Sequence, residues 1–178
     1  MSLLVCFSGQ IGSGKSSVSA AVAEALGWGR TGFGDFLRAE IARSGGDPTD
    51  RRGLQDLGQQ RVESDPEAFC HDVLDAGGFQ PGDDFVADGV RHAAIFRILR
   101  VLAAPSTARL LFLQASDTAR TARVKARSDH TDFQRAAGHR VEGELRDALP
   151  EQADAVIDAD RPFGDVVADC VALIRSWQ

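Results

Sequence analysis

The residues that most clearly indicate chemistry form the segment GQIGSGKS at positions 9–16. It satisfies the pattern G-x-x-x-x-G-K-[ST], which cradles nucleotide phosphates. A glycine-rich backbone offers polyphosphate oxygens several amide donors that no Cβ atoms obstruct. The ammonium group of Lys15 can reach the β- and γ-phosphates, and the Ser16 hydroxyl can ligate Mg²⁺. We therefore predict a site for a nucleoside triphosphate and Mg²⁺, with contacts from Gly9, Gly12, Ser13, Gly14, Lys15, Ser16 and Ser17.

The elements on either side of this loop have the character that phosphate binding requires. Residues 3–7 are apolar and favour a strand that is buried on both faces. From residue 16 to residue 26 the sequence is rich in alanine, and Val18, Val22 and Leu26 recur at the spacing of one helix face. The N-terminus of such a helix adds a partial positive charge beside the phosphates. This strand–loop–helix context argues against the alternative of an ordinary glycine-rich turn.

A second group of candidates follows the segment DDFVAD at residues 83–88, which predicts another core strand. Asp88 ends this strand and could hold Mg²⁺ or its waters, although a solvated aspartate or a helix cap is the alternative. Arg91 lies three residues later, where its planar guanidinium could grip an acceptor phosphate with two hydrogen bonds. The alternative for Arg91 is a surface arginine.

The segment GDFLR at residues 34–38 supplies candidates for the other side of an acceptor. A short strand is predicted over residues 30–33, and Asp35 is predicted to cap a helix that runs to about Arg43. Arg38 lies one turn into that helix and could grip the same phosphate as Arg91, the alternative being a solvated helix face. Phe33 could stack on a base or simply pack in the core.

A basic helix is predicted over residues 116–127, followed by a polar segment at 128–139. Arg123 and Arg127 are four residues apart, so both side chains project from one helix face. Between residues 120 and 140 there are six Arg or Lys and two Asp, in a chain whose net charge is −6. A triphosphate in transfer would bring anionic oxygens between these arginines. A solvated basic face is the alternative.

The remaining pattern predicts an α/β fold in one domain of 178 residues. Helices are expected after Asp47-Pro48 and after Asp65-Pro66, the second ending near residue 76. Further helices are expected at 93–102, 141–149 and 166–177, and strands at 109–114 and 155–157. Alternating strands and helices indicate a parallel sheet that is covered on both faces, with ligands at the carboxyl ends of its strands. The surplus helices before residue 83 suggest a helical flap over the site, or topological filler.

Composition restricts the class of protein. The net charge of −6 argues against a protein that coats a nucleic-acid polymer. There is no apolar run of 18 residues, and the run at 3–7 is too short for a signal peptide, so we expect no membrane partner. Cys6, Cys70 and Cys170 show no metal or disulfide spacing and are expected to be buried, reduced thiols of a cytoplasmic protein. Either a monomer or a homodimer is compatible with the sequence.

Together these motifs resemble the P-loop nucleoside monophosphate kinases, adenylate kinase and its relatives. The family's phosphate loop GxxGSGKS matches residues 9–16, and its acceptor-helix signature GDxLR matches residues 34–38. The family pattern DGfPR is approximated by DGVR at 88–91, and the lid-entry spacing RxxxR matches Arg123 and Arg127. The motifs occur in the family's order. Phage-type deoxynucleoside monophosphate kinases and less characterised adenylate-kinase-like small kinases are similar as well.

The resemblance implies a P-loop NTPase fold with a five-stranded parallel core, acceptor-binding helices at about 35–78 and a mobile lid at about 128–140. It implies ATP as the donor, with Mg²⁺, and a small-molecule phosphate acceptor. In this family Arg38 and Arg91 would bind the acceptor phosphate, with Asp35 beside them, and Arg123 and Arg127 would contact the transferring group. Lys15 and Asp88 complete the expected catalytic set.

The sequence also departs from the family pattern. Adenylate kinases carry a glutamine that reads adenine where this chain has Ile95, and a threonine where it has Phe33. The segment at 47–64 has no counterpart that aligns with adenylate kinase. A nucleoside or deoxynucleoside monophosphate is therefore the expected acceptor, without a named base. The alternatives are dephospho-coenzyme A, a hydroxylated metabolite, or an ATP-hydrolysing switch or assembly factor that has no acceptor.

Overall fold

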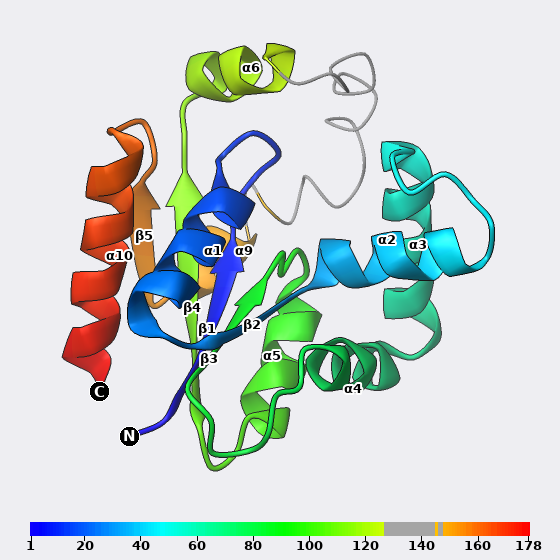
Figure 1. The fold of residues 1–178 in the computed structure, drawn as a ribbon, viewed down its shortest axis with the longest axis horizontal. Helices are drawn as coiled ribbons and strands as arrows, with labels where there is room; N and C mark the ends of the chain where they lie inside the picture. The colour runs from blue at the N-terminus through cyan, green and yellow to red at the C-terminus, as the bar shows by residue number, and fades with distance from the viewer. Residues whose placement is uncertain (127–144, 146–147) are drawn as a thin grey trace.

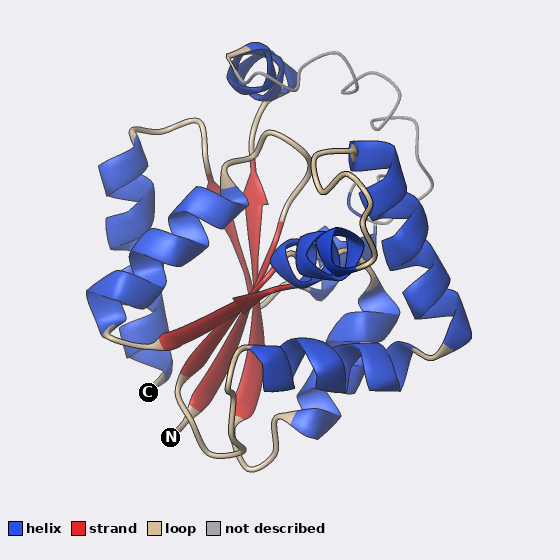
Figure 2. Cartoon of the chain, turned by 45° about the vertical axis from the view of Figure 1, so that its right-hand side comes forward, coloured by secondary structure: helices blue, strands red, loops and turns tan. Residues whose placement is uncertain are grey.

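A computed structural model describes residues 1–126, 145 and 148–178 of the chain. In the described part, the sheet has five parallel strands in the order β2-β3-β1-β4-β5. The predicted five-stranded parallel core is therefore confirmed, and Figure 2 shows it edge-on between helices on both sides. The strands are β1 (Leu3–Ser8), β2 (Gly29–Gly32), β3 (Phe85–Asp88), β4 (Thr107–Gln114) and β5 (Ala155–Asp158).

Two helical layers cover the sheet, and β1 is buried against both (Figure 1). Helices α1 (Lys15–Leu26) and α10 (Phe163–Trp177) lie on one face, where they cover Leu3, Val5 and Phe7. Helices α4 (Pro66–Ala76), α5 (Ala93–Leu102) and α9 (Ala148–Gln152) lie on the other, over Leu4 and Cys6. Successive side chains of a strand point to opposite faces, which explains why residues 3–7 of this strand are all apolar.

Beside the sheet, α2 (Phe33–Arg43), α3 (Arg51–Ser64) and α4 form a helical group, seen on the right of Figure 1. Arg61 of α3 holds the three helices together. Its guanidinium lies 5.8 Å from the ring centre of Phe36 on α2 and 5.4 Å from that of Phe69 on α4. It also pairs with Glu40 at 3.8 Å and with Asp72. These contacts with both neighbouring helices position α3.

Two of the predicted helix starts are wrong. Helix α2 begins at Phe33 after Gly32, and Asp35 lies in its first turn instead of capping it, because its carboxylate is engaged by arginines. Helix α3 begins at Arg51, where Asp50 accepts a hydrogen bond from the Arg52 amide.

The side chain of Asp47 explains the later start of α3. It accepts hydrogen bonds from the Thr49 amide and hydroxyl at 2.8 and 2.7 Å, which lower the pKa of Asp47 and close a turn before the helix. The predicted start at Asp65-Pro66 is confirmed: the Asp65 carboxylate accepts a hydrogen bond from the Ala68 amide at 2.9 Å.

The C-terminal part contains a third difference from the prediction. Pro150 lies inside α9 (Ala148–Gln152), whereas the sequence pattern placed it after the end of a helix. Helix α6 (Asp117–Lys125) is capped by the Ser116 hydroxyl. Arg127 and the predicted lid at 128–140 lie outside the described residues. Among the helices that are described, none is both long and apolar enough to cross a membrane.

The three cysteines are buried, unpaired thiols in the structure. Burial raises the pKa of Cys70 and of Cys170 to about 12, with smaller contributions from the neighbouring carboxylates of Glu67 and Asp169. Burial also raises the pKa of Cys6 far above its usual range. The expectation of inert core thiols agrees with these environments.

Candidate active site

The phosphate loop connects β1 to α1 and requires glycine at two positions for lack of space. A Cβ atom on Gly9 would lie 2.6 Å from the Ser13 hydroxyl and 2.7 Å from the Leu113 carbonyl oxygen. A Cβ atom on Gly12, whose φ is +83°, would lie 2.8 Å from the carbonyl oxygen of Arg120. These contacts are too short for any side chain, so the sequence motif reflects close packing of the loop against β4 and α6.

The polar groups of the loop are arranged as a polyphosphate ligand would require. Lys15 is the first residue of α1 and follows Gly14, which has a φ of +87°. Lys15 is 8% exposed. The next residues, Ser16 and Ser17, are exposed at the helix N-terminus. The Ser13 hydroxyl is buried and has no hydrogen-bond partner among the described residues. An anion in the loop would satisfy the backbone amides at this terminus and could accept from the Ser13 hydroxyl.

Two arginines of α6 support the loop from outside. Arg120 is 7% exposed; its Nε donates to the Ile11 carbonyl at 2.9 Å and one Nη donates to the Gln10 side chain at 3.1 Å. The sequence indicated Arg120 only as one residue of a basic segment and did not predict its contacts with the phosphate loop. The available signal was an arginine among the basic residues that follow a long apolar strand. Its partners in the loop, a backbone carbonyl and a glutamine side chain, lie 109 and 110 residues away in the sequence.

Arg123, expected at the transferring group, is also engaged with backbone. Its guanidinium donates to the Ser13 carbonyl at 3.3 Å and contacts the Gly12 carbonyl at 3.5 Å. A further bond goes to the carbonyl oxygen of Ala159, which follows β5. The side chain therefore lies against the phosphate loop, while its contact with a phosphoryl group stays a prediction.

Asp88 lies at the carboxyl end of β3, paired in register with Phe7 of β1 just before the phosphate loop. It is 4% exposed, and its Oδ2 accepts a hydrogen bond from an Nη of Arg30 at 3.1 Å. Its other oxygen, Oδ1, is buried with no partner within the described chain. A buried carboxylate oxygen without a donor fits a site for Mg²⁺ or a metal-bound water, with the Ser16 hydroxyl as the second expected group.

Arg30, the second residue of β2, contacts several of the predicted site residues and was not itself predicted to belong to the site. Its Nε donates to the Ser19 hydroxyl of α1 at 3.2 Å, and another nitrogen lies 3.5 Å from Asp35 of α2. Asp35 in turn accepts a bond from Arg38 at 2.8 Å. Because Arg30 also binds Asp88, one guanidinium joins the nucleotide-side helix, the predicted metal ligand and the predicted acceptor helix.

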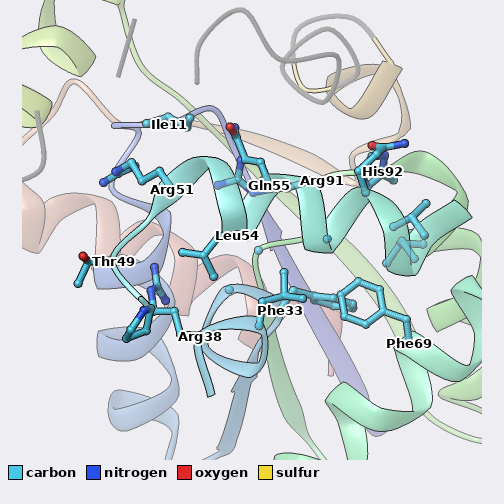
Figure 3. Close-up of a pocket in the computed structure, with 18 residues that line it drawn as sticks. Ile11, Phe33, Arg38, Thr49, Arg51, Leu54, Gln55, Phe69, Arg91 and His92 are labelled. Carbon is cyan, nitrogen blue, oxygen red and sulfur yellow. The ribbon is translucent and has the colours of Figure 1, made fainter. Parts of the chain in front are cut away.

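A cavity of about 530 Å³ lies beside the phosphate loop (Figure 3). It brings together the predicted acceptor residues Phe33, Arg38 and Arg91, together with Ile95; Asp35 does not line it. Phe33 is 5% exposed and meets Phe69 edge-on at 5.2 Å, so it packs in the core with part of its surface on the cavity. The lining consists of Ile11, Phe33, Gly34, Leu37, Arg38, Pro48, Thr49, Arg51, Leu54, Gln55, Gly58, Gln59, Val62, Phe69, Gly89, Arg91, His92 and Ile95.

The loop after β3 places Arg91 next to the donor side. The amides of Gly89 and Val90 both donate to the Phe7 carbonyl, at 3.0 and 3.1 Å. The Ser8 hydroxyl donates to the Val90 carbonyl at 2.6 Å. These bonds tie the loop to the end of β1, from which the phosphate loop departs. The cavity therefore opens beside the phosphate loop, and Ile11 of that loop forms part of its lining.

Helix α3 and the turn before it form a wall of this cavity. Pro48 and Thr49 come from the turn, and Leu54, Gln55, Gly58, Gln59 and Val62 recur along α3 at helical spacing. Gly58 allows close approach to α2, since a Cβ there would lie 3.1 Å from Leu37. The segment without a counterpart in adenylate kinase thus shapes the place where an acceptor would bind. The helices before β3 therefore line the cavity, and their function as a flap over an acceptor stays a prediction.

Comparison of the amino-acid sequence with known proteins does not show a family for this chain. No protein-family model matches the chain. A UPF0200 protein of Aeropyrum pernix is 37% identical over 97 residues, which is 54% of this chain and 51% of that protein. The chain therefore spans only about half the length of this curated relative.

Solved structures give a clearer result. A shikimate kinase from Bacteroides thetaiotaomicron superposes with a TM-score of 0.64 at 13% identity, covering 97% of this chain and 98% of that one. A putative kinase from Chloroflexus aurantiacus gives 0.63 at 17% identity, covering 98% and 97%. A gluconokinase from Sinorhizobium meliloti gives 0.55 at 21% identity, covering 95% and 89%. With the strand order and the phosphate loop, these likenesses show that the chain has the P-loop NTPase fold.

Proposed function

We propose that this protein is an ATP-dependent kinase that transfers a phosphoryl group to a small molecule already bearing a phosphate, a nucleoside or deoxynucleoside monophosphate. The observation that carries the proposal is the cavity beside the phosphate loop, which combines arginines with apolar walls. A switch that only hydrolyses ATP has no use for such a cavity. The kinase names of the structural neighbours support the same reaction class.

The chemistry needs positioning and neutralisation of charge rather than a covalent intermediate. An oxygen of the acceptor phosphate would attack the γ-phosphorus, the bond from that phosphorus to the β–γ bridging oxygen would break, and ADP would leave. Lys15 and the loop amides would stabilise the β- and γ-phosphates as charge moves onto the leaving oxygen. Ser16 and Asp88 are the residues proposed to hold Mg²⁺ or its waters. Arg123 and Arg127 are proposed for the transferring group.

The charges of the cavity favour an anionic acceptor. Arg38, Arg51 and Arg91 all line it, and guanidinium groups bind anionic oxygens through charge-assisted hydrogen bonds. The apolar side chains of Phe33, Leu54 and Ile95 offer a surface for a flat base. A nucleoside monophosphate has both features in one molecule.

The names of two similar solved structures suggest a second candidate acceptor. They are named for shikimate and gluconate, so a hydroxylated metabolite that does not resemble a nucleotide is the main competitor. The same cavity would then bind a carboxylate, which guanidinium groups also recognise in bidentate fashion.

A coupled assay of ADP release decides among these candidates. The panel comprises the ribonucleoside and deoxynucleoside monophosphates, dephospho-coenzyme A, shikimate and gluconate, each with ATP and Mg²⁺. We expect one or more monophosphates to raise ADP release well above basal hydrolysis. Stimulation by shikimate or gluconate alone would replace the nucleotide proposal, and a flat response to every compound would favour the hydrolytic switch.

A further inference from the structure

Gln59 of α3 carries a polar atom that the protein itself does not satisfy. The residue lines the cavity, and its carboxamide oxygen Oε1 is buried with no hydrogen-bond partner among the described residues. A buried acceptor without a donor is costly, and native proteins rarely keep one without a reason. A ligand that supplies the donor is such a reason.

The orientation of this amide follows from its neighbour on the helix. The Gln59 Nε2 donates to Oε1 of Glu63, one turn further along, at 2.7 Å. A carboxylate can only accept hydrogen bonds, so the amide nitrogen must face Glu63. The carboxamide oxygen is thereby held on the other side of the group, as an acceptor that cannot exchange places with the nitrogen.

We propose that Gln59 is a specificity residue whose Oε1 accepts a hydrogen bond from an N–H group on the base of the acceptor nucleotide. The inference rests on the proposed function. It assigns to α3 the recognition of the base edge, while the arginines bind the phosphate.

The position of Gln59 along α3 agrees with this division. Arg51 and Gln59 are eight residues apart, which is about 12 Å along a helix axis. In Figure 3 Arg38, Thr49 and Arg51 lie toward one end of the cavity and Phe69 toward the other. Val62 lines the cavity one turn beyond Gln59. A hydrogen bond among apolar side chains discriminates strongly, because a ligand without the donor leaves the acceptor unpaired.

The test compares acceptors that differ in one N–H group. Suitable pairs are AMP with purine riboside 5′-monophosphate, CMP with its analogue lacking the 4-amino group, GMP with inosine 5′-monophosphate, and dTMP with N3-methyl-dTMP. For at least one pair, we expect wild-type kcat/KM to favour the N–H-bearing member about ten-fold or more, as loss of one buried hydrogen bond predicts. In Gln59→Leu this ratio should fall to within about two-fold.

A second measurement needs no turnover. Because Gln59→Leu removes the unsatisfied oxygen, the ligand-free variant should melt about 2–4 °C higher than wild type. The matched control is Gln60→Leu, which changes an exposed glutamine of the same helix outside the cavity and should alter neither measurement.

The outcomes separate this inference from the function on which it rests. Wild-type activity on monophosphates with no discrimination in any pair, or with discrimination that persists in Gln59→Leu, would overturn the role of Gln59 alone. A lower melting temperature with an unchanged ratio would mark Gln59 as structural, which also overturns the role. If no monophosphate is phosphorylated, the nucleotide proposal itself fails, and the role of Gln59 fails with it.

Discussion

The donor side and the acceptor side of the proposed site are built in different ways. The phosphate loop is one continuous segment, shaped by glycines that pack against β4 and α6 and supported by Arg120 and Arg123 through backbone carbonyls. The cavity beside it is assembled from α2, α3, α4 and the loop after β3, and its lining consists largely of side chains. On the proposed function, the donor side would bind its ligand mainly with backbone groups and the acceptor side mainly with side chains.

This difference has a physical origin. A triphosphate presents the same oxygens in every nucleotide, so amide groups in a fixed loop can recognise it and the required glycines form a motif. An acceptor differs between enzymes, and its pocket is specified by whichever side chains packing brings together. Variants on the two sides should accordingly fail in different ways, and the following predictions run from the largest expected effect to the smallest.

Lys15→Ala should break the donor side. Loss of the ammonium group removes stabilisation of charge on the phosphates in the transition state, so kcat should fall by at least about a hundred-fold. The melting temperature should stay within a few degrees of wild type. Lys125→Ala is the matched control, since the chain has only these two lysines and Lys125 is exposed on α6. Substantial turnover by Lys15→Ala would contradict the assignment of the loop.

Arg91→Ala should weaken the acceptor side selectively. Charge-assisted hydrogen bonds to a phosphate predict a rise of about ten- to a hundred-fold in the acceptor KM, with the KM for ATP nearly unchanged. Steady-state kinetics with each substrate varied in turn measures both. Arg97→Ala, on the exposed face of α5, should leave both constants unaltered. An acceptor KM equal to that of wild type would remove Arg91 from the site.

Arg30→Met should affect the junction between the two sides. Without its guanidinium, the buried Asp88 carboxylate loses its charged partner and its fixed orientation. We expect kcat to fall about ten-fold and the dependence of rate on Mg²⁺ concentration to shift, since orientation of the groups around a metal is sensitive to such partners. Arg43→Met, at the exposed end of α2, serves as control. An unchanged Mg²⁺ dependence would argue against a metal role for Asp88.

Arg120→Ala should affect the donor side alone, because it alters support for the phosphate loop without touching the ligand. Loss of the bonds to Ile11 and Gln10 should lower the free energy of unfolding by about 1–3 kcal/mol. The KM for ATP should rise more than that for the acceptor. Chemical denaturation and kinetics together test this expectation. A larger effect on the acceptor KM would show that the two sides are not supported separately.

The smallest effect is expected at the cysteines. Since burial holds the pKa of Cys70 and Cys170 near 12, almost no thiolate exists in the folded protein at pH 8. Alkylation by iodoacetamide at this pH should be negligible until the protein is unfolded, as mass spectrometry would show. Rapid labelling of the native protein would mean that the core opens locally.

Much of the fold was predictable from sequence, because each local signal agreed with its neighbours. The apolar run of β1, the glycines after it and the alternation of strands and helices all indicate one parallel sheet, which the structure confirms. The start of α2 was predicted wrongly because Asp35 has the character of a cap, whereas its ion pairs with Arg30 and Arg38 depend on segments that fold beside it. The start of α3 was misplaced because the Asp47 side chain closes a turn with Thr49.

The phosphate loop was recognisable from the sequence, since contiguous residues and backbone geometry are sufficient to form it. The fold was needed to show that α3 forms a wall of the proposed acceptor cavity and that Arg30 and Arg120 contact residues of the proposed site. It also decided that Ile95 and Gln59 face the same space. The reason is that these contacts join distant segments, and the face that each helix turns toward its neighbours is set by packing of the whole chain.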